Sequence, residues 1–385
     1  MMSDRCRIAD ITEQIRGVSY KPNDLHKELD ENSVILLRAN NIDDGSINFD
    51  DILYVDTSKV SKNQFLQKGD ILICASSGSK HLVGKAAQVD FEGNYTFGAF
   101  CKVIRPIGIS PEYVGLFFQS PNYRKKISDL AQGANINNIK NEHIDNLLLN
   151  IPSANRIKEI TDILQRVSKI ILYRKQQLQQ LDNLIKARFV EMFEGDFPQI
   201  TANAACEAIV DCPHTTPKYI GNELICPAIR TSEIKNGFID WTSMKYVSRE
   251  ECRDRNKRLT PKRGDIVYAR EGTYGDCVIL PNGYDFCLGQ RTMLFRPNYD
   301  LITSEYLHQA LRSDNVKRQA DISNAGSTVP HVNVADAKEF SFPLPPLELQ
   351  NTFGDFVAQV DKSKDALTSI LSLEEDKNRK NAYNI

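Results

Sequence analysis

The hydrophobic pattern between residues 155 and 193 predicts one long helix. Apolar residues recur there at alternating steps of three and four, the a/d pattern of a coiled coil, and two arginines share the spacing. Neither Gly nor Pro falls inside, whereas Pro152 precedes the stretch and Gly195 follows it. Such a helix would span roughly 58 Å at 1.5 Å per residue, so we expect it to separate two domains. The a/d positions are Ile157, Ile160, Leu164, Val167, Ile171, Arg174, Leu178, Leu181, Ile185, Arg188 and Met192.

Residues 1–152 show the pattern of a mixed domain, with an amphipathic opening at Ile8, Ile11 and Ile15. Short strand-like runs follow, divided by turn signals, and a helical stretch comes after Pro111. The chain repeats this order after the long helix, because Gly264 follows Gly69 by 195 residues. The matched segments are Lys68-Gly69-Asp70-Ile71 with Arg263-Gly264-Asp265-Ile266, Arg105-Pro106 with Arg296-Pro297, Ser120 and Asn122 with Ser313 and Asn315, Gly133 with Gly326, and Pro152 with Pro345. Matches in one order at nearly one offset indicate a duplicated domain.

The long helix is repeated as well. A shift of 193 residues places Ile160, Leu164 and Val167 on Phe353, Val357 and Val360. If the second helix folds back antiparallel on the first, both apolar stripes are buried in a coiled coil. We therefore predict an α+β protein with two tandem mixed α/β domains, a long central helix and a C-terminal helix. The predicted segments are residues 1–152, 153–196, 197–345 and 346–385.

The first helix carries more apolar residues than one partner helix needs. They are Ile163, Ile170 and Leu184 at heptad spacing, together with Leu172. A face this wide should be buried against something else, and we interpret it as a docking surface for a partner protein. Two alternatives are that the globular domains cover it, or that the coiled coil only holds two domains together.

Composition limits the class of protein without naming it. The chain has 385 residues, with 41% apolar and 25% charged residues, which is usual for a soluble globular protein. No membrane span or signal-peptide core is present in the sequence, and the nine cysteines are scattered. Reduced thiols in a cytoplasmic protein are expected. The net charge of −2 means that any nucleic-acid surface must be local.

Sequence motifs for catalysis are not found. An Asn-Pro-Pro-aromatic motif with a glycine-rich cofactor loop would indicate a methyltransferase, and the chain has neither. Residues 78–86 resemble a P-loop but have one residue too many between the glycines, and Ala86 replaces the Ser or Thr that would bind magnesium. We therefore expect a non-catalytic chain that binds no cofactor or metal of its own.

Features typical of DNA binding are better represented. Residues 249–270 are rich in Arg and Lys, and a glycine-flanked loop follows them at the place of residues 76–81 in the first copy. Different polar side chains on one scaffold suit two readers of different sequences, and Arg or Gln can pair with guanine or adenine edges. A solvated helical face is the alternative for the basic stretch, and a solvent-facing strand pair for Gln290-Arg291. The candidate contacts are Ser76, Ser77, Ser79, Lys80, His81, Lys85, Arg258, Lys262, Arg270, Thr273, Tyr274, Gln290 and Arg291.

The whole chain resembles the specificity subunit of Type I restriction-modification systems. The resemblance rests on the doubled Lys68-Gly69-Asp70-Ile71 and Arg263-Gly264-Asp265-Ile266 segments and on residues 344–350, Leu-Pro-Pro-Leu-Glu-Leu-Gln, before the distal helix. The corresponding entry at residues 151–156 lacks the Leu-x-x-Gln pattern.

The resemblance implies that each domain recognises one half of a split site in double-stranded DNA. It also implies two methyltransferase subunits on the helix pair, which would methylate adenine N6 with S-adenosylmethionine, and a restriction subunit that translocates DNA. Two rival functions stay open: a free-standing protein that binds a split site, and a structural scaffold between two protein partners. A pull-down of methyltransferase subunits tests the first, and a salt-sensitive gel shift tests the second.

Overall fold

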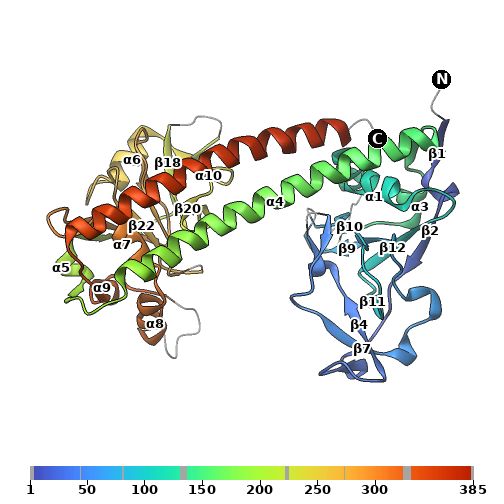
Figure 1. The fold of residues 1–385 in the computed structure, drawn as a ribbon, viewed down its shortest axis with the longest axis horizontal. Coiled ribbons are helices and arrows are strands. Elements are labelled where there is room, and N and C mark those ends of the chain that lie inside the picture. Colours follow the sequence, from blue (N-terminus) through green and yellow to red (C-terminus); the bar gives the residue numbers. More distant parts are fainter. Residues whose placement is uncertain are drawn as a thin grey trace. The chain divides into compact units, whose positions relative to one another are not determined.

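The computed structural model describes residues 4–43, 45–79, 82–130, 137–221, 225–272, 274–323 and 331–382. It divides into two compact units, Met1–Lys175 with Ser369–Ile385, and Gln176–Thr368. Each unit contains one mixed α/β domain and part of both long helices, α4 (Ala154–Phe193) and α10 (Leu347–Ala382) (Figure 1). We call the α/β part of the first unit domain 1 and that of the second unit domain 2. Both divisions between the units fall inside a long helix.

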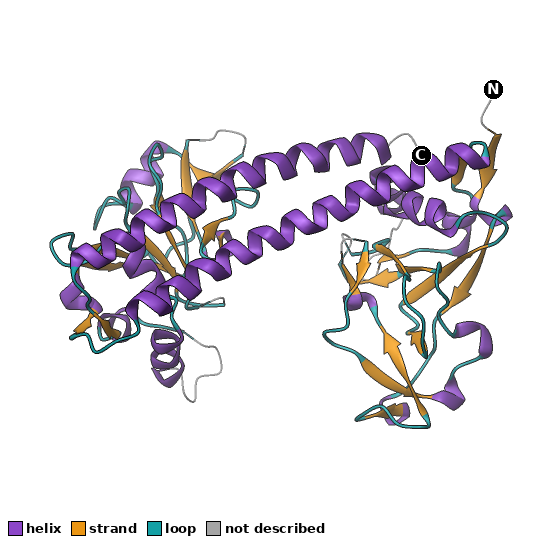
Figure 2. Cartoon of the chain, viewed as in Figure 1, coloured by secondary structure: helices purple, strands orange, loops and turns teal. Residues whose placement is uncertain are grey.

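The described residues of domain 1 form two four-stranded sheets, three two-stranded sheets and three α-helices; the arrangement of strands and helices is drawn in Figure 2. The first sheet has the order β10-β8-β12-β2 and is antiparallel, whereas in the second, β11-β4-β7-β3, the β11–β4 pair is parallel. The amphipathic opening forms two strands around a short 3-10 turn. The elements are β1 (Asp4–Arg7), β2 (Thr12–Arg16), β3 (Leu25–His26), β4 (Ser33–Leu37), β5 (Ile42–Asp43), β6 (Ser46–Ile47), β7 (Leu53–Asp56), β8 (Ile71–Cys74), β9 (Ser76–Ser77), β10 (Ala86–Gln88), β11 (Tyr95–Phe97), β12 (Cys101–Pro106), α1 (Pro111–Gln119), α2 (Pro121–Leu130), β13 (Asn137–Asn138), α3 (Asn141–Asp145) and β14 (Leu148–Ile151).

Domain 2 repeats the topology of both four-stranded sheets. Its sheets have the orders β16-β25-β22-β23 and β17-β21-β18-β24, and the β18–β24 pair is again parallel. The elements are β15 (Gln199–Thr201), α5 (Ala202–Ala205), β16 (Cys206–Asp211), β17 (Tyr219–Ile220), β18 (Cys226–Ile229), β19 (Ile234–Lys235), β20 (Phe238–Ile239), β21 (Lys245–Val247), α6 (Arg249–Arg255), β22 (Ile266–Ala269), β23 (Cys277–Ile279), β24 (Cys287–Leu288), β25 (Thr292–Pro297), α7 (Ser304–Leu311), α8 (Asp314–Ser323), α9 (Val334–Lys338) and β26 (Ser341–Pro343). The predicted α+β fold is confirmed; of its matched positions, Gly133 and Gly326 lie outside the described residues.

The repeated Gly-Asp motif forms the same buried ion pair in both domains. Arg105 Nη2 lies 2.7 Å from Asp70 Oδ2, and Arg296 Nη2 lies 2.7 Å from Asp265 Oδ2. Each arginine also donates from Nε to the second carboxylate oxygen, so both pairs are bidentate. The preceding glycine turns the chain with a positive φ, 94° at Gly69 and 85° at its counterpart. The motif that marks the duplication therefore fixes the turn before β8 and β22.

Helix α4 buries the predicted a/d face. Ile157, Leu164 and Ile185 are buried, and the remaining a/d residues are half-buried. In the second unit α10 runs antiparallel to α4, because Lys364 Nζ lies 2.6 Å from Asp182 Oδ1 and Phe353 packs on Phe189 and Phe193 nearer the start of α10. In the first unit the two helices are joined by the ion pair between Lys175 and Glu375, 3.1 Å long.

The expectation of reduced thiols throughout is wrong for two cysteines. Cys226 and Cys252 form a disulfide, because β18 and α6 bring together residues that are 26 positions apart. The other described cysteines are thiols. No spacing in the sequence indicates this pair. Within the described ranges, no helix has both the length and the apolarity needed to cross a bilayer.

Candidate functional site

Each domain has one set of loops at which the shared scaffold carries different side chains. Rim 1 consists of residues 75–79, 98–100 and 138, and rim 2 of residues 270–272, 274, 289–291 and 331. The backbone connections agree: Ala75 N donates to Phe100 O over 2.8 Å, and Arg270 N donates to Arg291 O over 2.9 Å. Ile139 and Val332 likewise donate to the carbonyls of Ala75 and Arg270, over 2.9 and 3.0 Å. These bonds make the rims structurally equivalent, whatever their side chains.

Rim 1 presents small polar groups and one exposed aromatic ring. Ser76 and Ser77 form β9, which pairs with β13, and Ser76 Oγ donates to Asn138 Oδ1 over 2.7 Å. Ser77 Oγ accepts from the backbone N–H of Ser79 over 3.1 Å. Phe100 is 66% exposed, which is unusual for so large an apolar residue. Ser76, Ser77 and Ser79, all predicted contacts, therefore lie together with Asn138 and Phe100.

Rim 2 is built around a chain of charged groups. Arg270 is only 5% exposed, forms an ion pair with Asp211, and donates to Val332 O over 2.8 Å and to His331 Nε2 over 2.8 Å. Because an arginine only donates, His331 Nε2 must accept, so the proton of a neutral ring lies on Nδ1 and faces Glu271 Oε1, 3.1 Å away.

The series of charged groups in rim 2 ends at an exposed arginine. Glu271 Oε2 lies 2.9 Å from Arg291 Nε, and the Arg291 side chain is 66% exposed. Arg291 lies in the turn between β24 and β25 and has a φ of 65°, a left-handed conformation that is uncommon outside glycine. Gln290 precedes it in the same turn, and Gln290 Nε2 donates to Thr216 Oγ1 over 3.0 Å. The Gln290-Arg291 pair is therefore part of a turn and not of a strand.

The remaining predicted DNA contacts have different surroundings. Tyr274 donates to Asp321, and this hydrogen bond raises the pKa of the Tyr274 phenol. Lys85 is half-buried and lies 3.9 Å from Asp43, whereas Arg258 and Lys262 are exposed beyond the end of α6. Lys80, His81 and Thr273 lie outside the described residues. A direct contact from any of these residues to DNA stays a prediction, and for Arg270 burial favours a role in supporting the rim.

Sequence reasoning missed four residues of the rims: Phe100, Asn138, Glu271 and His331. The repeat contained a signal for one pair, because a shift of 193 residues takes Asn138 onto His331. Their equivalence is visible in the structure, where Asn138 pairs with Ser76 and His331 bridges to Glu271. No local pattern marks Phe100 as exposed, since a phenylalanine before a strand is usually buried.

The predicted docking face of α4 is open in both units. Ile163 is 47% exposed, Ile170 43% and Leu172 52% in the first unit, and Leu184 is 47% exposed in the second. Neither domain covers these side chains, so the alternative of burial against the domains is excluded for them. The docking of a partner protein on this exposed apolar face stays a prediction.

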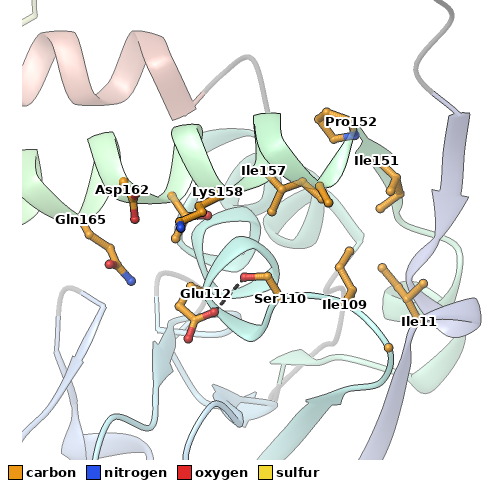
Figure 3. Close-up of a pocket in the computed structure, with 13 residues that line it drawn as sticks. Ile11, Ile109, Ser110, Glu112, Ile151, Pro152, Ile157, Lys158, Asp162 and Gln165 are labelled. Atoms are coloured by element: carbon orange, nitrogen blue, oxygen red, sulfur yellow. Dashed lines mark hydrogen bonds between the residues drawn. The ribbon is translucent and has the colours of Figure 1, made fainter.

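A cavity of about 670 Å³ lies where α4 leaves domain 1, lined by Ile11, Ile109, Ile157 and Lys158 among others (Figure 3). In domain 2 the residue equivalent to Ile157 is Gln350, which is fully buried. Gln350 accepts from Thr303 N over 2.9 Å and donates to Leu301 O and Pro345 O over 3.1 and 2.8 Å. Isoleucine cannot make these bonds, so the first entry, which lacks the Leu-x-x-Gln pattern, has no counterpart to this hydrogen-bonded contact; Ile157 instead lines the cavity.

The fold and the rims define a class: a duplicated α/β protein whose two copies share a scaffold and differ in the loops at one edge. A family model described as the Type I restriction modification DNA specificity domain matches residues 6–183 and 224–374. The chain belongs to this family.

Two relatives and one solved structure agree with this assignment. The Type I restriction enzyme StySPI specificity subunit of Salmonella potsdam is 38% identical over 180 residues, 46% of this chain and 39% of the relative. The Type I restriction enzyme EcoKI specificity subunit of Escherichia coli (strain K12) is 29% identical over 280 residues, 68% of this chain and 60% of the relative. A Type-I restriction-modification S subunit from M. genitalium has a similar fold, with a TM-score of 0.51 at 13% identity over 98% of this chain and 94% of that one.

Proposed function

We propose that this chain is the non-catalytic recognition subunit of a Type I restriction-modification complex, and that each domain recognises one half of a bipartite site in double-stranded DNA. The observation that carries the proposal is that the two rims have equivalent backbone hydrogen bonds but different side chains. Two domains with the same scaffold and different side chains at one edge are suited to recognising two different DNA sequences. Family membership supports the same function.

The side chains of the rims have the chemistry of base readout. Arg291 can pair with O6 and N7 of guanine, and Gln290 with N6 and N7 of adenine, once each leaves its present partner. In rim 1 the Asn138 amide is suited to adenine, and the Phe100 ring to the methyl group of thymine. The exposed Arg258 and Lys262 would contact phosphates, which position the protein without specifying sequence.

We further propose that two methyltransferase subunits dock on the exposed apolar face of α4 and transfer a methyl group from S-adenosylmethionine to adenine N6. The cofactor would belong to those partner chains. A restriction subunit that translocates DNA would join the larger complex. Ile163, Ile170, Leu172 and Leu184 support this proposal, because burying the exposed half of each side chain against a partner contributes about 1 kcal/mol.

Methylation mapping of genomic DNA tests the proposal. Cells that carry the methyltransferase subunit should methylate adenines within one bipartite motif when this chain is present, and not when it is absent. Methylation at the same motif without this chain would contradict the recognition role. Binding to DNA by the chain in a pull-down that recovers no methyltransferase subunit would instead favour the free-standing reader.

We propose that the helix pair sets the gap between the half-sites. Duplicating one heptad, residues 171–177, keeps the a/d register and lengthens the helix by roughly 10 Å. That length corresponds to about three base pairs at 3.4 Å each. The methylated motif should then keep both half-sites and gain about three base pairs between them. Because three pairs also rotate the groove by roughly 100°, affinity should fall. An unchanged gap would contradict the role of the helices as a spacer.

A further inference from the structure

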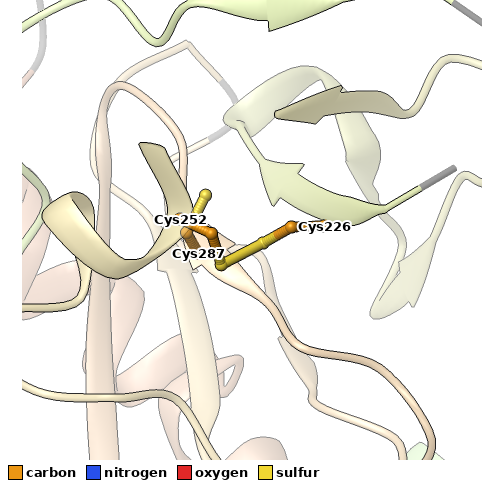
Figure 4. Close-up of side chains that lie close together, drawn as sticks. All are labelled: Cys226, Cys252 and Cys287. Atoms are coloured by element: carbon orange, nitrogen blue, oxygen red, sulfur yellow. A yellow bond between two sulfur atoms is a disulfide. The ribbon is translucent and has the colours of Figure 1, made fainter. Parts of the chain in front are cut away.

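Three cysteines of domain 2 meet in one buried cluster, which we call the cysteine site (Figure 4). Cys226 begins β18, Cys252 lies on α6, and Cys287 begins β24. Their sulfur atoms all lie within 4.8 Å of one another. Cys226 and Cys252 form a disulfide, and Cys287 is a thiol beside it. Three separate elements therefore bring three sulfur atoms to one point.

Domain 1 has residues without sulfur at the positions equivalent to Cys226 and Cys287. Its β4 and β11 pair in parallel as β18 and β24 do, which puts Val34 at the position of Cys226 and Thr96 at the position of Cys287. Both residues are buried as their counterparts are. Because the scaffold folds with Val and Thr at these positions, packing alone does not require cysteine there. The cysteines supply chemistry that domain 1 lacks.

One guanidinium and one amide N–H lie near the sulfur atoms, and two backbone carbonyls, Asp285 O and Phe286 O, lie 3.8 and 3.9 Å from Cys252 Sγ. Arg255 is 6% exposed and donates to Leu288 O over 3.0 Å, and its ion pair with Glu251 is 3.8 Å long. Burial raises the pKa of the Cys287 thiol to about 12, and the charge of Arg255 opposes that rise. Asn256 Nδ2 lies 3.6 Å from Cys252 Sγ, where its N–H can donate to sulfur. Arg255 and Asn256 therefore offset part of the effect of burial, while the Cys287 thiol stays mostly protonated, and exchange proceeds through the small fraction present as thiolate.

We propose that the cysteine site is a thiol–disulfide exchange site that is oxidised by small hydroperoxides. Cys252 is the most exposed of the three at 6%, so it reacts first. Its thiolate attacks one oxygen of hydrogen peroxide, the O–O bond breaks, and a sulfenic acid forms while hydroxide leaves and takes up a proton as water. The Cys226 thiol then attacks the Cys252 sulfur, the S–O bond breaks, and a second water leaves. Two thiols are oxidised to one disulfide, and one peroxide is reduced to two waters.

Cys287 gives the site a second pairing. Its thiolate can attack the Cys252 sulfur, which forms a bond between residues 252 and 287 and releases Cys226 as thiolate, with no net oxidation. Both pairings tie α6 to the second sheet of domain 2. Because α6 runs directly into the exposed Arg258 and Lys262, oxidation fixes the start of that basic segment. The inference does not depend on the proposed DNA function.

Disulfide mapping of the full chain tests the proposal. The reduced protein is treated with equimolar hydrogen peroxide, blocked with an alkylating agent and digested, and cross-linked peptides are identified by mass spectrometry. The wild type should show the link between residues 226 and 252. The variant Cys226→Val, which introduces the residue that domain 1 uses, should show the link between 252 and 287 instead. Fragment ions must separate Cys287 from Cys277, which lies in the same tryptic peptide.

Two controls make the result decisive. Cys287→Thr, also taken from domain 1, should keep the link between 226 and 252 at the wild-type yield. The buried Cys277 lies apart from the cysteine site, beside His308 O at 3.7 Å, and should stay a thiol throughout. The absence of any link in the wild type, or of the 252–287 link in Cys226→Val, would overturn the proposal. A peroxide-treated chain whose α6 amides exchange hydrogen as fast as in the reduced chain would overturn the coupling to the basic segment.

Discussion

Rim 1 and rim 2 occupy equivalent positions on the same scaffold, but their side chains differ in size, charge and hydrogen bonding. In rim 1 the position of Arg270 is Ala75, and the polar side chains are three serines and Asn138, which accepts a hydrogen bond from Ser76. In rim 2 a buried arginine holds Asp211 and His331 and so supports the charged chain that ends at Arg291. The backbone hydrogen bonds that define the edge join equivalent donors and acceptors in both rims. The comparison teaches that backbone hydrogen bonds keep the edge in place while side chains can be exchanged.

The scaffold should be the most sensitive part, and its two copies should fail independently. Asp265→Ala removes one partner of a buried bidentate pair and leaves Arg296, 12% exposed, without its carboxylate. The loss is about 3–5 kcal/mol of unfolding free energy. Denaturant unfolding followed by the fluorescence of Trp241, the single tryptophan, reports domain 2 alone. Asp70→Ala, the matched change in domain 1, should leave the Trp241 transition in place. Equal shifts from both variants would show that the domains unfold as one.

Docking should be the next largest effect, and it should not involve either rim. Ile163→Asp combined with Ile170→Asp places two charges on the exposed face of α4. Burying them against a methyltransferase subunit costs several kcal/mol, so binding should weaken at least 100-fold, or about 3 kcal/mol. Co-purification and calorimetry measure the loss. The double Ile→Val variant keeps the face apolar and should bind as the wild type does; full binding by the Asp variant would place the docking site elsewhere.

How much of this the sequence predicts depends on how local each feature is. The a/d face of α4 depends only on the spacing within one helix, and Ile157, Leu164 and Ile185 are buried as expected. The exposure of Ile163 and Ile170 follows from the same periodicity. The Gly-Asp motif was equally visible because it repeats as a contiguous segment. Local periodicity and duplication therefore predict the architecture.

The rims and the cysteine site could not be predicted in this way, because their residues come from segments far apart in the chain. Arg270 was predicted to contact DNA, yet Asp211 and His331, 59 and 61 residues away, hold its side chain in the interior. A buried arginine is indistinguishable from an exposed one until its partners are placed. The disulfide between Cys226 and Cys252 could not be predicted from the sequence for the same reason. The fold brings the two cysteines together, and their spacing in the sequence does not indicate the pairing.

Lowering the pH should destabilise domain 2 more than domain 1. His308 on α7 is buried and neutral, whereas the equivalent position on α1 is Gly115. Burial lowers the pKa of His308 to about 3, while an unfolded histidine titrates near 6.5. The unfolded chain therefore binds a proton that the folded domain does not, so stability is complete above pH 6.5 and falls as the pH decreases toward 3. At about 1.4 kcal/mol per pH unit, domain 2 should lose about 2 kcal/mol at pH 5.

Trp241 fluorescence at pH 7 and pH 5 measures this loss. His308→Gln keeps an N–H that can donate to Cys277 O, which His308 Nε2 contacts at 2.9 Å, and removes the titrating ring. The variant should lose less stability between the two pH values than the wild type. An equal loss in both would assign the acid sensitivity to other groups.

Substitutions in the rims should have the smallest effects on free energy, and each should affect only one half-site of the DNA. Arg291→Ala removes the exposed guanidinium of rim 2, and Phe100→Ala removes the exposed ring at the same position of rim 1. A bidentate arginine–guanine pair contributes about 1–3 kcal/mol of discrimination. Arg291 must leave Glu271, 2.9 Å away, to reach DNA, so we expect the lower end of this range, about tenfold in affinity.

Binding to DNA with single substitutions in each half-site distinguishes the two rims. Arg291→Ala should relax discrimination at one position of the second half-site and leave the first unchanged, and Phe100→Ala should do the reverse. The salt dependence should stay the same in both variants, because neither removes a phosphate contact, whereas Arg258→Ala should lower it by about one counterion. If Arg291→Ala weakened both half-sites equally, the rims would be parts of one surface, and the separation of scaffold from readout would be wrong.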